Sequence, residues 1–201
     1  MKQVVLASGN AGKLKEFGQC LVPLGIELVS QSQFVSEEVE ETGLSFVENA
    51  ILKARHASQA SGMPALADDS GLEVDVLGGA PGIYSARYAD SNLKGAAKDA
   101  ANSAQLIANL ADIPLNQRTA RFQCVLVYMR HAADPTPLIC QAAWEGVIMD
   151  SAQGDHGFGY DPIFQVIEKG CRAAQLSPIE KIAISHRGKA LSQLQRALAQ
   201  N

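Results

Sequence analysis

Short apolar strands alternate with amphipathic helices through the first half of the sequence. Residues 4–7 form a buried strand pattern, residues 8–12 a glycine-rich turn, and residues 13–24 carry apolar side chains at helical spacing. A second helix is expected over residues 45–62, because Ser45 and Glu48 can cap its first turn. Strands that alternate with helices in this way predict an α/β fold.

Later segments predict that the sheet is mixed. Residues 64–67 and 72–76 are two short strand patterns, and residues 119–129 and 138–149 are two long ones that we expect to form an antiparallel hairpin. Further helices are expected over residues 97–110, after Pro178 and around residues 190–198. No linker or internal repeat divides the sequence, so residues 1–201 are expected to form a single domain.

Charge and composition exclude several classes of function. The chain has 17 basic and 21 acidic residues, a net charge of -4, so no overall positive field exists to hold nucleic acid or an anionic membrane. No apolar run reaches the roughly 18 residues of a membrane span, and residues 4–7 are too short for a secretory signal. The four scattered cysteines argue against a zinc or redox site. We therefore expect a cytoplasmic protein whose anionic ligand is small.

The turn at residues 8–13 lies where a phosphate group is often bound. It leads from a strand into a helix, where free backbone amides and the helix dipole favour an anion, and Lys13 adds a positive charge. It is not a Walker A loop, because Leu14 stands where that motif needs a hydroxyl residue. Taken alone, the segment is equally well interpreted as a plain turn with a solvated lysine.

Two adjacent carboxylates suggest a metal site. Asp68 and Asp69 follow an apolar strand pattern and fall, with Ser70 and Gly71, between two predicted strands, where they would repel one another without a cation or several amide donors. Oxygen ligands without a Cys/His cluster favour a hard divalent ion, magnesium above others. The structural alternative is an Asx turn in which Asp69 caps the next segment.

Acidic and polar residues also gather around the predicted helix at 45–62. Glutamates precede it at four positions, Glu37, Glu38, Glu40 and Glu41. On the helix, Asn49, Lys53 and His56 share one face, from which Lys53 can reach a phosphate. Each group taken alone is more often a solvated surface than a binding site.

Three later segments are candidates for recognition. Residues 157–162 place two aromatic residues, Phe158 and Tyr160, between glycines that would leave their rings open to a planar base; a core plug is the alternative. Residues 185–189 concentrate hydrogen-bond donors between two helical patterns and suit carbonyl or phosphate oxygens, or simply begin a basic helix. Residues 78–87 are rich in glycine and proline, which suits a loop whose backbone comes close to a ligand or a partner subunit; a purely structural turn is the alternative.

Together these motifs resemble the inosine triphosphate pyrophosphatase family, also called the Ham1 or RdgB family. The resemblance covers nearly the whole chain, and the order and intervals of the motifs are specific although each is weak singly. The matching segments are residues 8–13, 40–43, 46–50 with Lys53 and Ala54, 67–72, 81–82 with 85–87, 157–162 and 185–187.

The resemblance implies an enzyme that removes inosine and xanthosine triphosphates (ITP, XTP, dITP and dXTP) from the nucleotide pool, releasing the monophosphate and pyrophosphate. It also implies an elongated mixed sheet flanked by helices, as in Maf-like proteins, with an active-site cleft between two lobes. A homodimer and a Mg²⁺ cofactor are expected as well.

Carried over by position, the resemblance assigns roles to individual residues. Asp69 would accept the proton in catalysis and, with Glu40, hold the metal; Glu41 and Asp68 are further candidate ligands. The triphosphate would be bound by Ser8, Gly9, Asn10, Ala11, Gly12, Lys13 and Lys53. The remaining substrate contacts would come from Ser70, Phe158, Gly159, Tyr160, Asp161, Lys181, His186 and Arg187.

Two other functions stay open. One is a Maf-type pyrophosphatase of modified pyrimidine triphosphates, against which residues 158 and 185–187 argue. The other is a non-catalytic nucleotide sensor, which would need the glycine turn and the lysines but not the acidic pair Asp68 and Asp69.

Overall fold

The computed structural model describes residues 1–37 and 39–200, and of Ala11 only the backbone. The chain divides into two compact units. Unit 1 contains Met1–Asp69, Cys124–Ala142 and Lys189–Asn201, and unit 2 contains Ser70–Gln123 and Ala143–Gly188. Three long strands and the last helix contribute residues to both units: β3 (Ala65–Val74), β5 (Thr119–Met129), β6 (Leu138–Ile148) and α5 (His186–Ala199).

The strands form a mixed sheet in the order β2-β1-β3-β5-β6-β7-β8, with β4 paired to β3. β1 (Lys2–Leu6) is parallel to β2 (Ile26–Ser30) and to β3. The short strands β4 (Pro81–Gly82), β7 (Phe164–Val166) and β8 (Cys171–Arg172) are antiparallel to their partners. The predicted α/β fold with a mixed sheet is confirmed.

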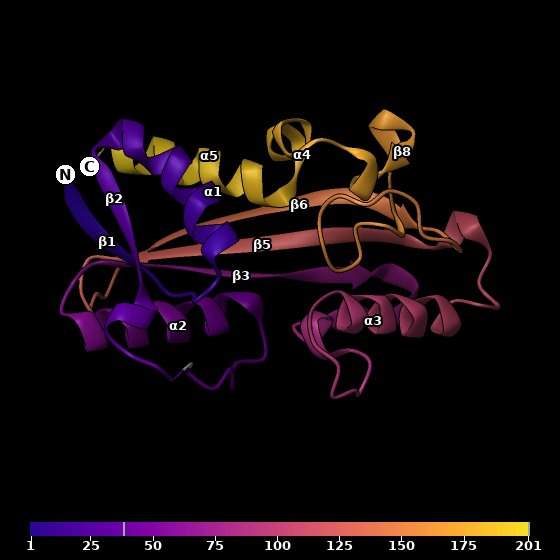
Figure 1. The fold of residues 1–201 in the computed structure, drawn as a ribbon, viewed down its shortest axis with the longest axis horizontal. Helices are drawn as coiled ribbons and strands as arrows, with labels where there is room; N and C mark the ends of the chain where they lie inside the picture. Colours follow the sequence, from indigo (N-terminus) through magenta and orange to yellow (C-terminus); the bar gives the residue numbers. More distant parts are fainter. Residues whose placement is uncertain (38, 201) are drawn as a thin grey trace. The chain divides into compact units, whose positions relative to one another are not determined.

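In unit 1, helices cover both sides of β1 and β2. Figure 1 shows α1 (Ala11–Leu21) and α5 on one side of these strands and α2 (Phe46–Ser61) on the other. The helix predicted over residues 13–24 is α-helical only as far as Leu21, because Pro23 cannot continue an α-helix. A 3₁₀ turn over Val22–Leu24 follows it. The predicted caps of α2 are present: Ser45 Oγ accepts from the Glu48 amide, and Gly62 ends the helix with a positive φ of 70°.

Unit 2 has its own apolar core. Helix α3 (Gly95–Asn109) lies on one side of its strands and α4 (Pro178–Ile184) on the other (Figure 1). The core combines residues from the strands, α3 and the loop at 160–163, including Leu72, Leu106, Phe122, Trp144 and Phe164. The antiparallel pairing of β5 with β6 follows from contacts that run in opposite directions along the chain: Ile148 N donates to Arg118 O, and Arg121 pairs with Glu145.

One prediction about the strands is wrong. Residues 64–67 and 72–76 are not two strands separated by a turn; β3 runs without interruption from Ala65 to Val74. Asp68 and Asp69 therefore lie within a strand and point to opposite faces, neither at a strand end nor in an Asx turn. Aspartate is unfavourable in strands, but here each carboxylate has a lysine partner, and the ion pairs offset the local preference.

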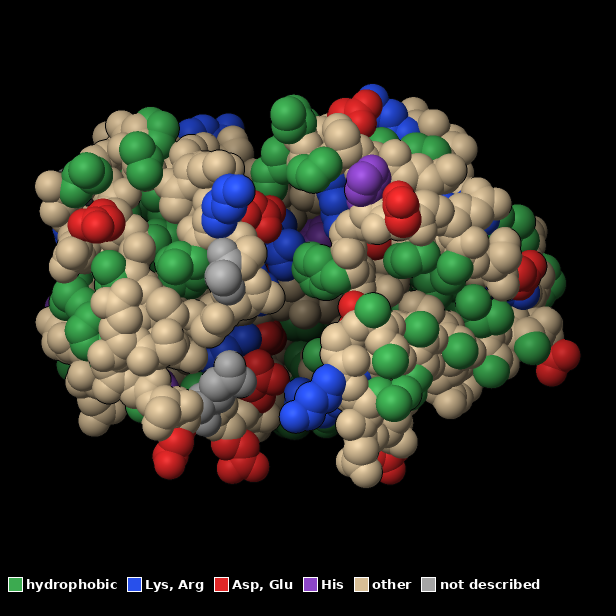
Figure 2. Space-filling view, viewed as in Figure 1, with side chains coloured by type: hydrophobic (Ala, Val, Ile, Leu, Met, Phe, Trp, Pro, Cys, Tyr) green, Lys and Arg blue, Asp and Glu red, His purple; other side chains and the backbone are tan. Residues whose placement is uncertain are grey.

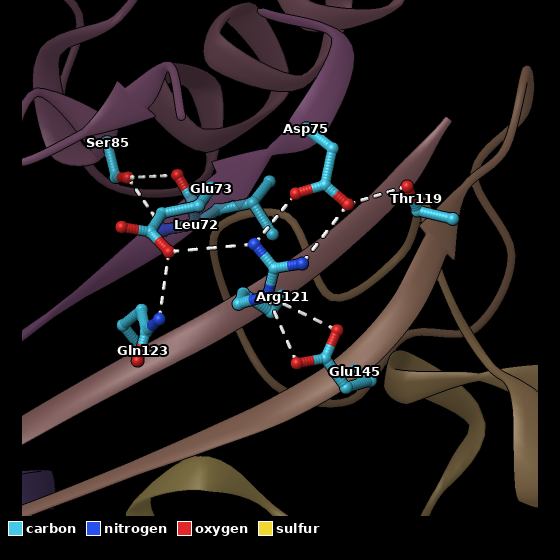
Figure 3. Close-up of polar contacts among 8 residues, drawn as sticks. All are labelled: Leu72, Glu73, Asp75, Ser85, Thr119, Arg121, Gln123 and Glu145. Carbon is cyan, nitrogen blue, oxygen red and sulfur yellow. Dashed lines mark hydrogen bonds and ion pairs between the residues drawn. The ribbon is translucent and has the colours of Figure 1, made fainter. Parts of the chain in front are cut away.

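Arg121 of β5 pairs with acidic residues of β6 and of the turn that follows β3 in unit 2 (Figure 3). Its guanidinium donates to both carboxylate oxygens of Asp75, at 2.7 and 3.1 Å, and its Nε donates to Glu145 of β6 at 3.0 Å. Hydrogen bonds from Arg121 and Thr119 lower the pKa of Asp75. Gln123, two residues along β5, donates to Glu73 of β3 at 2.8 Å. Period-two alternation thus turns Arg121 and Gln123 outward and Phe122 into the core.

The residues 78–87 have a structural role in unit 2. Ser85 Oγ accepts a hydrogen bond from the Leu72 amide at 2.8 Å (Figure 3). It also donates to Gly82 O at 2.6 Å. The Tyr160 hydroxyl donates to Ser85 O at 2.8 Å. The loop is therefore tied to β3 and to the core, as the structural-turn interpretation expects.

The surface carries charges of both signs. On the face drawn in Figure 2, acidic and basic side chains are interspersed among uncharged ones and do not gather into one basic field. Within residues 1–37 and 39–200, no helix has the length and apolar character that crossing a membrane requires.

Candidate functional site

One face of α2 fastens the acidic segment that precedes it in unit 1. Asn49 accepts from the Gly43 amide at 2.8 Å, Lys53 donates to Glu41 Oε1 at 3.1 Å, and the His56 ring lies 3.3 Å from Glu37 O. A Cβ on Gly43 would lie 2.7 Å from Asn49 Oδ1, so only glycine permits this approach. The face Asn49, Lys53 and His56 is therefore neither simply solvated nor open. Glu38 lies outside the described residues.

Lys53 joins two of the predicted metal ligands. Its Nζ lies 2.6 Å from Asp69 Oδ1 and 3.1 Å from Glu41 Oε1. Of the two candidate glutamates, Glu41 is thus brought together with Asp69, while the Glu40 side chain is exposed. Burial alone would lower the pKa of Lys53, but the carboxylates of Asp69 and Glu41 outweigh it and raise that pKa, so the ammonium form is favoured.

The surroundings of Asp69 shift the pKa of its carboxyl group. Burial raises the pKa of its carboxyl group to about 6; Lys53 opposes this shift, and the carboxylates of Glu41 and Asp68 add to it. A base works best when its pKa lies close to the working pH, and burial with perturbed ionisation is typical of catalytic carboxylates.

The neighbouring carboxylate, Asp68, has a separate set of contacts. Its side chain is almost fully buried, and its Oδ2 lies 2.7 Å from Lys13 Nζ. The Cys124 thiol lies 3.4 Å from Asp68 Oδ1. Lys13 thus links the turn at residues 8–13 to β3 within unit 1.

Part of the donor capacity of the turn at residues 8–13 is already used. Asn10 caps α1: its Oδ1 accepts from the amides of Gly12 and Lys13, at 2.8 and 3.1 Å. Ser8 Oγ accepts from the Asn10 amide at 3.1 Å. Gly9 is exposed, and the backbone of Ala11 begins the helix. The amides of Asn10, Gly12 and Lys13 are therefore engaged within the turn, and a phosphate there would use other donors or displace these contacts.

The carboxylates of unit 1 fit a hard divalent cation by their chemistry. Among the described residues, no group of three or more His, Cys, Asp or Glu side chains is arranged to hold a metal by itself. Magnesium is commonly bound by one or two carboxylates together with substrate phosphates and water, not by a cage of protein ligands. A pair such as Asp69 with a neighbouring glutamate is therefore enough when a triphosphate supplies further oxygens.

The second group of predicted residues lies in unit 2 around Phe158. This ring is exposed, and the cations of Lys181 and Arg187 lie over it, at 5.4 and 5.5 Å from its centroid. Buried Asp161 accepts from the Phe158 amide at 2.8 Å and forms an ion pair with Lys181. A Cβ on Gly157 would lie 2.1 Å from Asp161 Oδ2, so glycine is required there. One carboxylate thus fixes both the aromatic residue and a cation.

The other aromatic residue of this segment is not open to a ligand. Tyr160 is 4 % exposed and packs in the core of unit 2, where burial raises the pKa of its hydroxyl. The prediction of two uncovered rings is therefore correct for Phe158 and wrong for Tyr160. The segment is a turn and not an extended strand, and Gly159 between the two rings has a positive φ of 63°, so the backbone changes direction there and one ring lies outward while the other lies inward.

His186 and Arg187 form the first turn of α5 and do not lie in a separate segment before it. Both are buried, and the His186 ring stacks on Phe122 with centroids 4.9 Å apart. His186 thus has a packing role in addition to any contact with a ligand. The last predicted residue, Ser70, is half-buried within β3.

The sequence analysis missed several residues that contact the predicted site residues. They are Cys124, Ser30 and Asp99, which contact Asp68, Ser8 and Gly159, respectively. Each of them is distant in the sequence from the residue that it contacts. The period-two pattern of residues 119–129 indicates that Cys124 faces inward, but only the strand order tells which residue it meets.

Comparisons with known proteins show which family this chain resembles. The model of the Ham1 family matches residues 4–197. A dITP/XTP pyrophosphatase of Shewanella oneidensis is 61% identical over 98% of this chain and 94% of its own length, and one of Salmonella typhimurium is 57% identical over 98% of both.

Solved structures show the same likeness. A HAM1 protein of Coxiella burnetii has a TM-score of 0.93 and 47% identity over 100% of both chains. The Ham1 protein of Staphylococcus aureus has a TM-score of 0.88 and 40% identity over 98% of both. The chain therefore belongs to the Ham1 family.

Proposed function

We propose that this protein hydrolyses inosine and xanthosine triphosphates, ribo or deoxy, to the nucleoside monophosphate and pyrophosphate. The observation that carries the proposal is the buried Asp69, whose carboxylate contacts Lys53 at 2.6 Å and whose pKa is raised to about 6. The relatives named dITP/XTP pyrophosphatase supply the substrate class. They lend no support to a Maf-type enzyme or a non-catalytic sensor.

The phosphate end of the substrate is assigned to Asp69, Lys13 and Lys53. Asp69 takes a proton from the water that cleaves the anhydride bond between the first two phosphates, and pyrophosphate leaves. Lys13 and Lys53 stabilise negative charge on the phosphate oxygens as point charges. Asp69 and Glu40, with Glu41 and Asp68 as further ligands, would hold Mg²⁺, which polarises phosphoryl oxygens and lowers the pKa of bound water.

The base end is assigned to the residues around Phe158. Phe158 offers an exposed ring for stacking, and Arg187 and Lys181 carry donors beside it. Hypoxanthine and xanthine have an acceptor oxygen at the 6-position, where adenine has an amino donor. Donors that pair with the oxygen are left unpaired by adenine, which disfavours that base.

A panel of purified triphosphates tests the proposal directly. The protein is incubated with magnesium and ITP, XTP, dITP, GTP, ATP or a modified pyrimidine triphosphate, and the products are separated by ion-exchange chromatography. We expect monophosphate and pyrophosphate in equal amounts from the inosine and xanthosine nucleotides, with much slower turnover of ATP and GTP. Preference for the pyrimidine nucleotide would support the Maf-type alternative, and no turnover of any nucleotide would support the sensor.

Lys53→Met is expected to weaken hydrolysis of every triphosphate to a similar degree. Methionine keeps the apolar stem but removes the ammonium, and a charged hydrogen bond is worth about 1.5–3 kcal/mol, so kcat/KM should fall about 10- to 100-fold with ITP and with GTP. The matched control is Lys15→Met, which removes an exposed lysine of the same unit. A loss confined to one base would show that Lys53 does not serve the phosphates.

Arg187→Ala is expected to reduce selectivity as well as rate. If its guanidinium donates a hydrogen bond to the 6-oxygen, kcat/KM should fall about 10- to 100-fold with ITP, because that is the loss expected when a charged hydrogen bond is removed. The fall with ATP should be smaller. Because Arg187 is buried, Arg187→Lys is measured in parallel; it keeps the charge but loses the planar fork. Equal losses for both substrates in both variants would assign Arg187 to the phosphates or the fold.

The assembly and location of the protein belong to the same proposal. We expect a cytoplasmic homodimer that binds neither nucleic acid nor membrane. The net charge of -4 supports a small anionic ligand over a polyanion. Sedimentation of the purified chain measures the oligomeric state.

A further inference from the structure

Helix α3 contacts the loop around Phe158 through two polar side chains. Asp99 Oδ2 accepts a hydrogen bond from the Gly159 amide at 2.8 Å, and Ser103 Oγ donates to the Gly159 carbonyl oxygen at 3.4 Å. Asp99 and Ser103 are four residues apart and therefore share one face of the helix. Both backbone groups of Gly159 are thus held by α3.

An open space lies beside the loop on this side. A cavity of about 370 Å³ lies between α3 and the loop, lined on the helix side by Ala96, Ala100 and Ala104 and on the loop side by Gly157 and Phe158. Alanine side chains stop at Cβ and leave this space unfilled. Asp99 and Ser103 supply polar contacts from α3 to Gly159 beside this space.

The loop needs such an anchor because of its backbone. Gly157 and Gly159 adopt positive φ angles of 79° and 63° on either side of the exposed Phe158. Glycine has more conformational freedom to lose on folding than any other residue, so a segment of this kind stays ordered only when other groups hold it. Asp161 holds the Phe158 amide from one end, and Asp99 holds Gly159 from the other.

We propose that Asp99 is a positioning residue for base recognition, which orients Phe158 by holding the Gly159 amide. In this proposal Asp99 acts through the loop and has no role at the phosphates or the reacting water. This inference rests on the function proposed above, because it assigns the ring of Phe158 to the purine base. Ser103 supports the same backbone unit through its carbonyl oxygen.

The experiment compares Asp99→Ala and Asp99→Asn with the wild-type protein. Asparagine keeps an acceptor oxygen of the same size, so it should restore most of what alanine loses. Asp112→Ala is the matched control, because Asp112 belongs to the same unit, is exposed and carries the same charge. Thermal melting of each variant checks that the fold is retained.

Two readouts separate positioning from a general loss of structure. In Asp99→Ala we expect kcat/KM for ITP to fall about 10-fold, chiefly through KM, the loss typical of one hydrogen bond with a charged partner. Turnover of ATP should change less than that of ITP, so the ratio between the two substrates falls. Amide hydrogen exchange at Gly159 should become faster in Asp99→Ala and return toward the wild-type rate in Asp99→Asn.

The outcomes are distinguishable. If the wild-type protein prefers ITP and Asp99→Ala keeps the same ratio of ITP to ATP turnover, the positioning role is wrong although the proposed function stands. If the wild-type protein hydrolyses no purine triphosphate, the proposed function fails, and exchange at Gly159 alone decides whether Asp99 orders the loop. Unchanged exchange in Asp99→Ala overturns the inference in either case.

Discussion

Asp69→Asn is expected to lower kcat by about 10²-fold or more while leaving the fold intact, because acid–base catalysis is typically worth 10²- to 10⁴-fold. Asparagine has nearly the same size and keeps an oxygen that can accept from Lys53, which contacts Asp69 Oδ1 at 2.6 Å. What it loses is the negative charge and the ability to take a proton. Steady-state kinetics with saturating ITP and magnesium measure the effect.

The control for this experiment is Asp112→Asn, which makes the same chemical change at an exposed position outside the candidate site. It should keep normal kcat and KM, and circular dichroism should show the same fold for both variants. A normally active Asp69→Asn protein would remove Asp69 from its role as base and leave the water to be activated by another group.

Removal of divalent metal is expected to lower the rate of hydrolysis at least as much as Asp69→Asn does. With excess chelator, turnover of ITP should fall to the background rate, and added magnesium should restore it. The physical reason is that clustered carboxylates and a triphosphate repel one another unless a cation lies between them, and metal ions supply much of the charge stabilisation in phosphoryl transfer. Calcium should restore activity poorly, because its looser coordination misplaces the reacting groups.

Chelator and metal can also act on stability, so a second measurement accompanies the kinetics. The melting temperature should change little with chelator, since Lys53 and Lys13 already neutralise Asp69 and Asp68 when no metal is bound. Binding of magnesium alone can be followed by calorimetry. Full turnover of ITP in excess chelator would show that the carboxylates of unit 1 have another task.

Much of the fold was predictable because it depends on local interactions. The helix that starts after Ser45 and the one that starts after Ser177 were located from capping residues whose partners lie three positions away. The strands at 119–129 and 138–149 were located from apolar patterns, and each lies within one residue of the predicted limits. Local preference failed at Asp68 and Asp69, where ion pairs with distant lysines keep β3 continuous.

The sequence by itself determined the family and the chemical types available: carboxylates with lysines near the start of the chain, and an aromatic residue with basic residues near its end. Only the tertiary structure decided which of them meet. It joins Glu41 to Asp69 through Lys53, exposes Phe158 while burying Tyr160, and places Asp99 on Gly159. Helix caps and apolar periodicity depend on residues only a few positions apart, so they can be recognised in the sequence. These contacts join residues up to 60 positions apart, and they depend on strand order and helix packing, which local spacing does not determine.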